Sequence, residues 1–230
     1  MEYLHNGYTL VIQEGCFPLS TDSMALAGFV KLKKGARVLD LGSGCGTLGL
    51  LLCADHPECS VAGIELSGTA HTAALENIRA NGLQQRMESI CADLRQIATL
   101  VAPGSFSTCV SNPPYFSAGP ESRATPTARR EDCCTLEDLF RAASWAVRYG
   151  GDFFLVHRPE RLAEICGWAA KFDMAPKRLC LLRHRSDDPI SLILVQCRKG
   201  GKPGLIWEEV SLFDANGEPT PYYRSLYHLE

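Results

Sequence analysis

Short apolar runs alternate along the chain with segments in which apolar residues recur at helical spacing. Runs that are apolar throughout are typical of parallel strands whose two faces are both covered by helices. This pattern predicts an α/β fold, with helices on both faces of one mostly parallel sheet. The predicted helices span residues 23–30, 47–54, 68–81, 135–148 and 159–171. The seven predicted strands span residues 37–41, 60–66, 87–91, 106–111, 152–157, 177–183 and 190–196.

The last two predicted strands are separated only by residues 184–189, which contain the turn sequence Asp-Asp-Pro. A connection this short joins antiparallel strands, whereas parallel strands need a crossover of a dozen or more residues. We therefore expect five parallel strands followed by a terminal antiparallel hairpin. The main domain is predicted to span residues 1–200, and residues 201–230 are predicted to form a C-terminal tail after a glycine-rich linker.

The composition is that of a globular domain, since 46% of the 230 residues are apolar and 21% are charged. No apolar stretch reaches the ~20 residues that a membrane span needs. The first residues lack the basic and apolar regions of a signal peptide. We therefore expect a cytoplasmic protein with no membrane partner. The eleven cysteines include no CxxC pair, so the sequence predicts reduced thiols, with neither a disulfide framework nor a metal site.

Charge is distributed unevenly along the chain. The net charge of −3 argues against a protein that coats nucleic acid by bulk electrostatics, yet residues 171–202 hold eight basic residues against three acidic ones. Such a segment is typical either of a phosphate-facing patch or of a solvated face near a sheet edge, and both interpretations stay open. Residues 116–134 are rich in Ser, Pro, Gly, Ala and Arg, and their length and polarity make them a candidate substrate loop.

A glycine-rich loop follows the first predicted strand, where residues 40–46 read Asp-Leu-Gly-Ser-Gly-Cys-Gly. Its glycines let the backbone turn sharply and approach a ligand, and the helix predicted after it offers N–H groups. Gly44, Gly46 and Gly49 also satisfy GxGxxG, a pattern of nicotinamide- and flavin-binding proteins. Asp40 is unfavourable beside a pyrophosphate but suits a ligand with a free ammonium group. The alternative is that Asp40 only caps the loop.

Acidic residues also end the second and third predicted strands. Glu65 lies at the end of the strand at 60–66, and Asp93 follows the strand at 87–91. Because ligands of α/β sheets bind at the carboxyl ends of the strands, we expect Asp40, Glu65 and Asp93 on one rim. There Glu65 suits the hydroxyls of a ribose, and Asp93 suits the amine of an adenine.

The fourth predicted strand is followed directly by Asn112-Pro113-Pro114-Tyr115. The prolines fix φ and donate no backbone hydrogen bond, so the Pro113 carbonyl is held as an acceptor beside the Asn112 carboxamide. Two convergent acceptors suit the NH2 group of a planar amine or amide, and Tyr115 offers an aromatic face to a base. A turn that merely ends the strand is the structural alternative.

Together, residues 40–46, Glu65, Asp93 and residues 112–115 resemble the motifs of class I S-adenosylmethionine-dependent methyltransferases that modify exocyclic amino groups. The resemblance spans residues 17–197. It implies a Rossmann-like fold, with S-adenosyl-L-methionine as the cofactor and S-adenosylhomocysteine as the product.

Within this class the chain is similar to the bacterial tRNA adenine-N6 methyltransferases, which modify the adenine beside the anticodon of valine tRNA. The further likeness rests on Phe-Pro-Leu-Ser-Thr-Asp-Ser at residues 17–23 and on residues 128–139, which lead from the long loop into a helix. It implies methyl transfer to the exocyclic amine of an adenine in RNA, with tRNA as the partner. The adenine is expected to be flipped out or already unpaired.

The resemblance assigns roles to individual residues. The residues expected to bind the cofactor are Thr21, Asp22, Asp40, Gly42, Ser43, Gly44, Gly46, Glu65, Leu66, Asp93, Leu94 and Asn112. The residues expected to hold the target amine are Asn112, Pro113, Pro114 and Tyr115. Further RNA contacts are expected from stacking on Tyr115 or Phe116 and from phosphate binding by Arg123, Arg129, Arg130, Arg178, Arg183 and Arg185.

Three alternative functions are open beside RNA methylation. Enzymes with the same four-residue motif also methylate a glutamine side-chain amide in release factors, but these carry a helical domain before the catalytic domain, and only about twenty residues precede Thr21 here. Others methylate adenine in DNA and usually add a target-recognition domain. A dehydrogenase that uses the GxGxxG spacing is the remaining alternative, and a titration with NAD would identify it.

Overall fold

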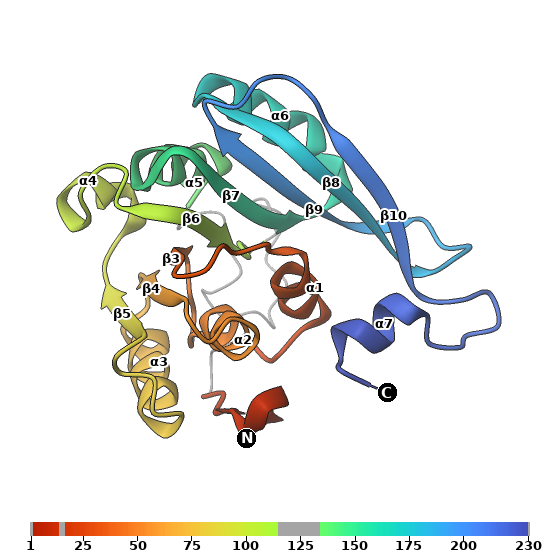
Figure 1. The fold of residues 1–230 in the computed structure, drawn as a ribbon, viewed down its shortest axis with the longest axis horizontal. Coiled ribbons are helices and arrows are strands. Elements are labelled where there is room, and N and C mark those ends of the chain that lie inside the picture. The colour runs from red at the N-terminus through yellow and green to blue at the C-terminus, as the bar shows by residue number, and fades with distance from the viewer. Residues whose placement is uncertain (1, 14–16, 115–133, 230) are drawn as a thin grey trace, which may run out of the picture.

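The computed structural model describes residues 2–13, 17–114 and 134–229. Its centre is an eight-stranded sheet with the order β10-β8-β9-β7-β6-β3-β4-β5 (Figure 1). The strands are β3 (Arg37–Leu41), β4 (Ser60–Glu65), β5 (Met87–Cys91), β6 (Phe106–Ser111), β7 (Val147–His157), β8 (Met174–Arg185), β9 (Ile190–Lys199) and β10 (Ile206–Phe213).

Strands β3 to β7 pair in parallel, and β9 lies antiparallel to both β7 and β8. The predicted α/β fold, with five parallel strands followed by a terminal hairpin, is therefore confirmed. Parallel pairing brings the carboxyl ends of β3, β4, β5, β6 and β7 to one edge of the sheet. The side chains that follow these strands gather at that edge.

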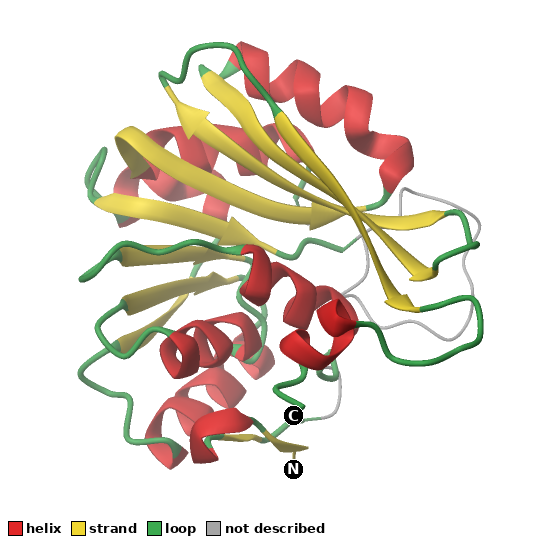
Figure 2. Ribbon diagram, turned by 45° about the vertical axis from the view of Figure 1, so that its right-hand side comes forward, coloured by secondary structure: helices red, strands yellow, loops and turns green. Residues whose placement is uncertain are grey.

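Helices cover both faces of the sheet (Figure 2). Neighbouring residues of β7 point to opposite faces, so Phe153 packs in one core and Phe154 in the other. The core that contains Phe154 lies against α1 (Thr21–Phe29), α2 (Thr47–Asp55), α3 (Gly68–Ala80) and α7 (Pro221–Leu226). The core that contains Phe153 lies against α4 (Ile97–Leu100), α5 (Leu136–Ala146) and α6 (Leu162–Lys171). Short 3-10 turns are η1 (His5–Gly7), η2 (Leu94–Gln96) and η5 (Pro159–Arg161).

Both ends of the described chain pack against the first helices. A two-stranded hairpin, β1 (Glu2–Tyr3) and β2 (Thr9–Leu10), precedes α1, and the Asn77 side chain of α3 bonds the backbone of Val11. At the other end, Leu226 of α7 packs over Gly28 of α1. Within the described residues, no helix is long and apolar enough to cross a membrane.

The sheet has one strand more than the seven predicted. Residues assigned to a C-terminal tail form β10, which pairs in parallel with β8 at the edge of the sheet. Its first residues, Ile206 and Trp207, are 73% and 63% exposed, and Glu208 and Glu209 pair with arginines of β8. An edge strand with apolar residues in solvent and charges beside them has no buried apolar run, so its sequence did not indicate a strand.

Candidate active site

A cavity of about 320 Å³ opens at the carboxyl edge of the sheet. It lies between the loop after β3, the start of α1 and the residues that follow β6 and β7. Its lining brings together two motifs that are more than sixty residues apart in the sequence. The lining residues are Phe17, Pro18, Ser20, Asp22, Ser23, Asp40, Gly42, Ser43, Gly44, Cys45, Thr47, Leu48, Asn112, Pro113, Pro114 and Arg158.

The glycine-rich loop presents bare backbone to this cavity. Gly42 and Gly44 have φ values of 76° and 56°, in the left-handed region that favours glycine. A Cβ built at either residue would meet no atom within 4 Å, so the space beside them is open to a ligand. Gly46 is the N-cap residue of α2 and faces inward instead, because a Cβ there would lie 2.9 Å from Cε of Met87. The loop can therefore approach a ligand while α2 stays packed on the sheet.

Asp40 is the penultimate residue of β3, next to the loop, and is almost fully buried, with 2% of its surface exposed. Among the described residues, none gives its Oδ2 atom a hydrogen bond. Burial, and then the negative charge of Glu65, raise the pKa of Asp40 to about 8. A buried carboxyl oxygen without a partner is costly, and a cationic ligand group beside it would remove that cost.

Ser43 also lines the cavity, but its hydroxyl lies against the neighbouring strand. Its Oγ atom stands 2.5 Å from the place where a Cβ of Gly63 would be, and no hydrogen-bond partner for it is found in the described part of the chain. Because Gly63 of β4 has no side chain, the Ser43 hydroxyl can occupy the space beside it.

Glu65 supports the loop from behind. Its Oε2 accepts a hydrogen bond of 2.8 Å from the Gly44 N–H, and its Oε1 accepts one of 2.7 Å from the Ser67 N–H. The adjacent Leu66 is 47% exposed. The predicted contact of Glu65 and Leu66 with a ribose stays a prediction, and the structure adds that Glu65 fixes the loop that such a ligand would touch.

Asp93 follows β5 at the same edge, next to β4. Its carboxylate binds the guanidinium of Arg95, with Nε 2.8 Å from Oδ2, and this pairing lowers the pKa of Asp93. The side chain also accepts the Arg95 N–H at the start of η2. Leu94 is 92% buried in the core with its neighbour Ile97. The predicted adenine contact by Asp93 and Leu94 remains a prediction, and an adenine amine would meet a carboxylate already paired with arginine.

The start of α1 forms one wall of the cavity. Ser20 caps the helix, and its side chain accepts the Ser23 N–H. Asp22 lines the cavity, and its predicted position over the cofactor stays a prediction. Thr21 turns toward the C-terminal helix, where its Oγ1 lies 3.2 Å from the Tyr227 hydroxyl. Of the two neighbouring residues expected over the cofactor, Asp22 faces the cavity and Thr21 ties α1 to α7.

Asn112, Pro113 and Pro114 form the opposite wall. The buried Ser111 hydroxyl donates 2.8 Å to the Leu41 carbonyl, which fastens the end of β6 beside the glycine-rich loop. Asn112 donates from Nδ2 to the Ser23 hydroxyl at 3.0 Å. The two motifs that the sequence placed after different strands therefore meet in one cavity. Tyr115, Phe116, Arg123, Arg129 and Arg130 lie outside the described residues.

Several cavity residues were not predicted, and Arg158 is the most informative of them. It follows β7 directly and donates from one guanidinium nitrogen to the Ser191 carbonyl at 3.1 Å. The rule that ligands bind at the carboxyl ends of strands could have indicated it, since the strand itself was predicted. Ser23 belongs to the motif at residues 17–23 on which the resemblance rests, but no role was predicted for it. The other unassigned lining residues are Phe17, Pro18, Ser20, Cys45, Thr47 and Leu48.

The three arginines near the terminal hairpin differ in what surrounds them. Arg178 lies over the Phe29 ring at 4.2 Å and pairs with Glu208, so its charge is engaged in the fold. Arg183 pairs with Glu209 at 2.9 Å. Arg185 is exposed, and no ion pair of its guanidinium is found within residues 134–229. The phosphate contacts predicted for these three arginines stay predictions, and Arg185 is the one of them whose side chain is exposed.

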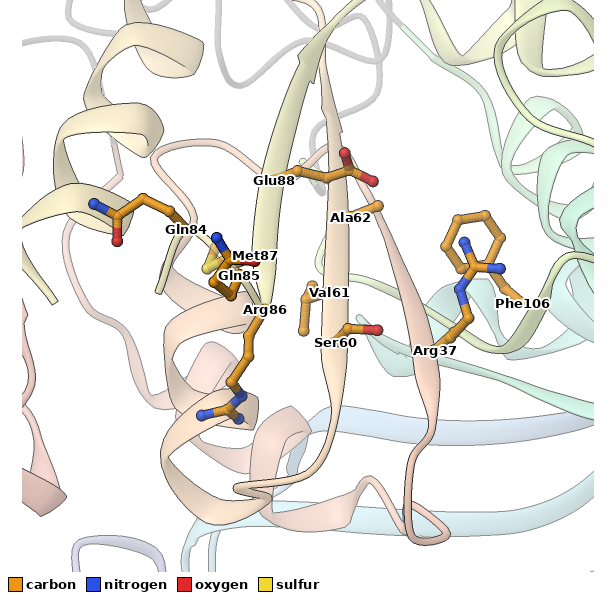
Figure 3. Close-up of a pocket in the computed structure, with 10 residues that line it drawn as sticks. All are labelled: Arg37, Ser60, Val61, Ala62, Gln84, Gln85, Arg86, Met87, Glu88 and Phe106. Carbon is orange, nitrogen blue, oxygen red and sulfur yellow. The ribbon is translucent and has the colours of Figure 1, made fainter. Parts of the chain in front are cut away.

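A second cavity, of about 210 Å³, lies at the opposite edge of the sheet. Figure 3 shows Arg37 facing the Phe106 ring, while Arg86 and Glu88 point in different directions. The Arg86 guanidinium donates to the carbonyls of α2 and the loop after it, which stabilises that turn. This cavity lies at the amino ends of the strands, away from the two predicted motifs.

Comparison with known proteins bears on this arrangement. A protein-family model described as "Methyltransferase small domain" matches residues 18–165. The chain is 34% identical over 141 residues to the tRNA1(Val) (adenine(37)-N6)-methyltransferase of Bacteroides fragilis, which is 60% of this chain and 59% of that protein. A protein of the same name from Photobacterium profundum is 27% identical over 188 residues, covering 79% of this chain and 78% of the relative. The match thus spans less than two thirds of the Bacteroides protein.

A solved structure shares the fold over nearly the whole chain. It is that of a predicted O-methyltransferase from Agrobacterium tumefaciens, with a TM-score of 0.76 and 22% identity. The superposition covers 90% of this chain and 96% of the Agrobacterium chain. The Rossmann-like arrangement predicted from the sequence is therefore confirmed.

Proposed function

Because this chain belongs to the methyltransferase small domain family, we propose that it transfers a methyl group from S-adenosylmethionine to the exocyclic amine of an adenine in RNA, with tRNA as the substrate. The observation that carries the proposal is the single cavity that joins Asp40 and the glycine-rich loop to Asn112 and Pro113. The name of the two curated relatives, a tRNA adenine-N6-methyltransferase, supports the choice of acceptor. A tRNA substrate would also place the protein in the cytoplasm.

The described residues fit this cofactor. Asp40 offers a buried acceptor to an ammonium group, and the open sides of Gly42 and Gly44 leave room for the methionine part. Glu65 holds the loop in place through the Gly44 N–H. When bound, S-adenosylmethionine would supply a methyl group on its positively charged sulfonium.

The remaining chemistry falls to Asn112 and Pro113. An adenine amine is a poor nucleophile because its lone pair is delocalised into the ring. Acceptance of its two N–H bonds by Asn112 Oδ1 and the Pro113 carbonyl would draw the nitrogen out of the ring plane and free the lone pair for attack. The same two oxygens would stabilise the positive charge that the nitrogen gains, so the transfer needs no general base beforehand.

Arg158 favours a nucleic acid over a glutamine side chain as the acceptor. Its side chain lines the same cavity as Asn112 and Pro114. A guanidinium suits the phosphate that accompanies a flipped nucleotide, whereas a peptide amide brings no charge of its own.

The test is to incubate the protein with labelled S-adenosylmethionine and unmodified total RNA, digest the RNA to nucleosides, and measure N6-methyladenosine. We expect label in tRNA adenosine, lost by about 10²- to 10³-fold in Asn112→Ala. Asn216→Ala, at an exposed turn after β10, is the matched control and should keep the wild-type rate.

Binding of S-adenosylhomocysteine to the same variants separates the possible failures. An Asn112→Ala variant that binds the product but no longer methylates supports the role of Asn112. Full turnover by that variant would contradict the mechanism. Label that is absent from RNA but present in DNA or in a release factor would contradict the RNA assignment. The assignment of the cofactor site would be unaffected.

A further inference from the structure

Ser23 lies where the two halves of the candidate site meet. It is 93% buried, in the first turn of α1, and it lines the cavity opposite the residues that follow β6. Its hydroxyl oxygen accepts a 3.0 Å hydrogen bond from Asn112 Nδ2. The acceptance of a target amine requires the other end of that carboxamide, Oδ1. Ser23 therefore contacts the end of Asn112 that must face away from the substrate.

A hydrogen bond of this kind is needed to fix which end of an asparagine carboxamide faces the substrate. Its oxygen and nitrogen ends are nearly the same shape, so a rotation of 180° exchanges an acceptor for a donor at little steric cost. A rotated Asn112 would present N–H groups to an amine that also donates. The acceptor would be lost although every atom stayed within the site.

A serine hydroxyl alone does not set the direction, since it both donates and accepts. Ser20 supplies the missing constraint, because its Oγ lies 3.3 Å from Ser23 Oγ and also accepts the Ser23 N–H at the helix N-cap. When the Ser23 hydroxyl donates to Ser20, it has only lone pairs left for Asn112. In this arrangement Ser23 can accept a hydrogen bond from Asn112 Nδ2 but has no hydrogen left to donate to Asn112 Oδ1.

We propose that Ser23, directed by Ser20, is a positioning residue that holds the Asn112 carboxamide with its oxygen toward the acceptor amine. The proposal rests on the proposed function, because it assumes that Asn112 binds the amine. It links the N-terminal helix to the methyl-transfer step and makes α1 part of the catalytic geometry as well as of the cofactor pocket.

Steady-state methylation of RNA by Ser23→Ala tests the catalytic consequence. We expect turnover to fall about tenfold, the effect of one lost hydrogen bond, with the affinity for S-adenosylhomocysteine unchanged. Ser23→Thr keeps the hydroxyl and should recover most of the rate. Ser20→Gly keeps a tolerated N-cap but loses the acceptor, so it should lower turnover in the same direction. The matched control is Ser107→Ala near the amino end of β6, away from the cavity, where the hydroxyl donates to the Arg37 carbonyl at 3.1 Å.

A double-mutant cycle distinguishes positioning from a general structural effect. When Asn112 is already alanine, the further change Ser23→Ala should cost nothing, because there is no carboxamide left to orient. An equal loss in both backgrounds would overturn the proposal. Wild-type turnover by Ser23→Ala, with Asn112→Ala inactive, would overturn it too while leaving the proposed function intact.

A measurement that needs no substrate covers the case in which the RNA assignment fails. The side-chain NH2 signals of Asn112 in a ¹⁵N-correlated NMR spectrum can be assigned with Asn112→Asp, and their hydrogen exchange can be measured. We expect slow exchange in the wild type and in Ser107→Ala, and fast exchange in Ser23→Ala. Identical exchange in all three proteins would show that Ser23 does not hold the carboxamide, and would overturn the proposal whatever the acceptor is.

Discussion

Binding of the cofactor should release a proton from Asp40. Burial, and then the charge of Glu65, raise the pKa of Asp40 to about 8, so its carboxyl is mostly protonated at neutral pH before a ligand binds. The ammonium group of S-adenosylmethionine, or of its product, would favour the ionised form. The proton must therefore leave as the ligand enters, and the affinity becomes dependent on pH.

The raised pKa of Asp40 determines the size of this effect. With a pKa of about 8, about one Asp40 in ten is ionised at pH 7 and about one in a hundred at pH 6. A ligand that binds only the ionised form loses about tenfold in affinity for each pH unit below 8 and releases about 0.9 proton at pH 7. The affinity should rise with pH and level off above the pKa of the free protein.

Isothermal titration calorimetry with S-adenosylhomocysteine measures both quantities, in paired buffers of different ionisation enthalpy. Asp40→Asn cannot ionise, so it should bind weakly, with no pH dependence and no proton release. Asp93→Asn is the matched control, because the Arg95 guanidinium already lowers the pKa of Asp93. It should release as many protons as the wild type. Release of less than about 0.2 proton at pH 7, or equal release from Asp40→Asn, would refute the reasoning.

Two further predictions concern stability and RNA binding. Burial, and then the charge of Arg161, lower the pKa of His157 to about 4, so the stability linked to its neutral form is present above pH 6.5 and is lost as the pH falls. His157 alone should contribute a loss of about 3 kcal/mol in unfolding free energy between pH 7 and pH 4. Because Asp40 shifts stability the opposite way over this range, urea denaturation should show this loss as the difference between the wild type and His157→Asn. For RNA, Arg185→Ala should reduce the slope of log Kd against log salt by about one. Arg178→Ala should leave that slope unchanged and lower the melting temperature, and the reverse pattern would contradict the assignment.

The strands were predictable because burial and turn chemistry mark them in the sequence. The predicted bounds of β3, β5 and β6 agree with the structure residue for residue. Their parallel pairing then brings the residues that follow them to one edge, which is why Asp40 and Asn112 could be expected in one site. The same rule could have indicated Arg158, which directly follows the predicted strand at 152–157, but no motif marks that residue in the sequence.

Contacts between residues that are distant in the sequence could not be predicted from the sequence alone. Ser23 and Asn112 are 89 positions apart, and their hydrogen bond depends on how α1 packs across the end of β6. The pairing of Asp93 with Arg95 is local, and an arginine two residues after the carboxylate could have indicated it. Strand β10 forms because it pairs with β8, although its exposed apolar and charged residues do not follow the pattern of a buried strand.

The position of Asp40 is itself an argument for a ligand. Its folded pKa is raised above 3.8, so between about pH 4 and pH 8 the unfolded chain prefers the charged carboxylate and the fold loses stability as the pH rises. An asparagine could end the strand without that loss, and Glu65 already holds the loop through Gly44. Asp40 destabilises the free protein at neutral pH, and its buried Oδ2 has no hydrogen-bond partner among the described residues. Both features are explained by a state in which a cation lies beside it. The same carboxyl that weakens the empty fold would then stabilise the cofactor-bound one.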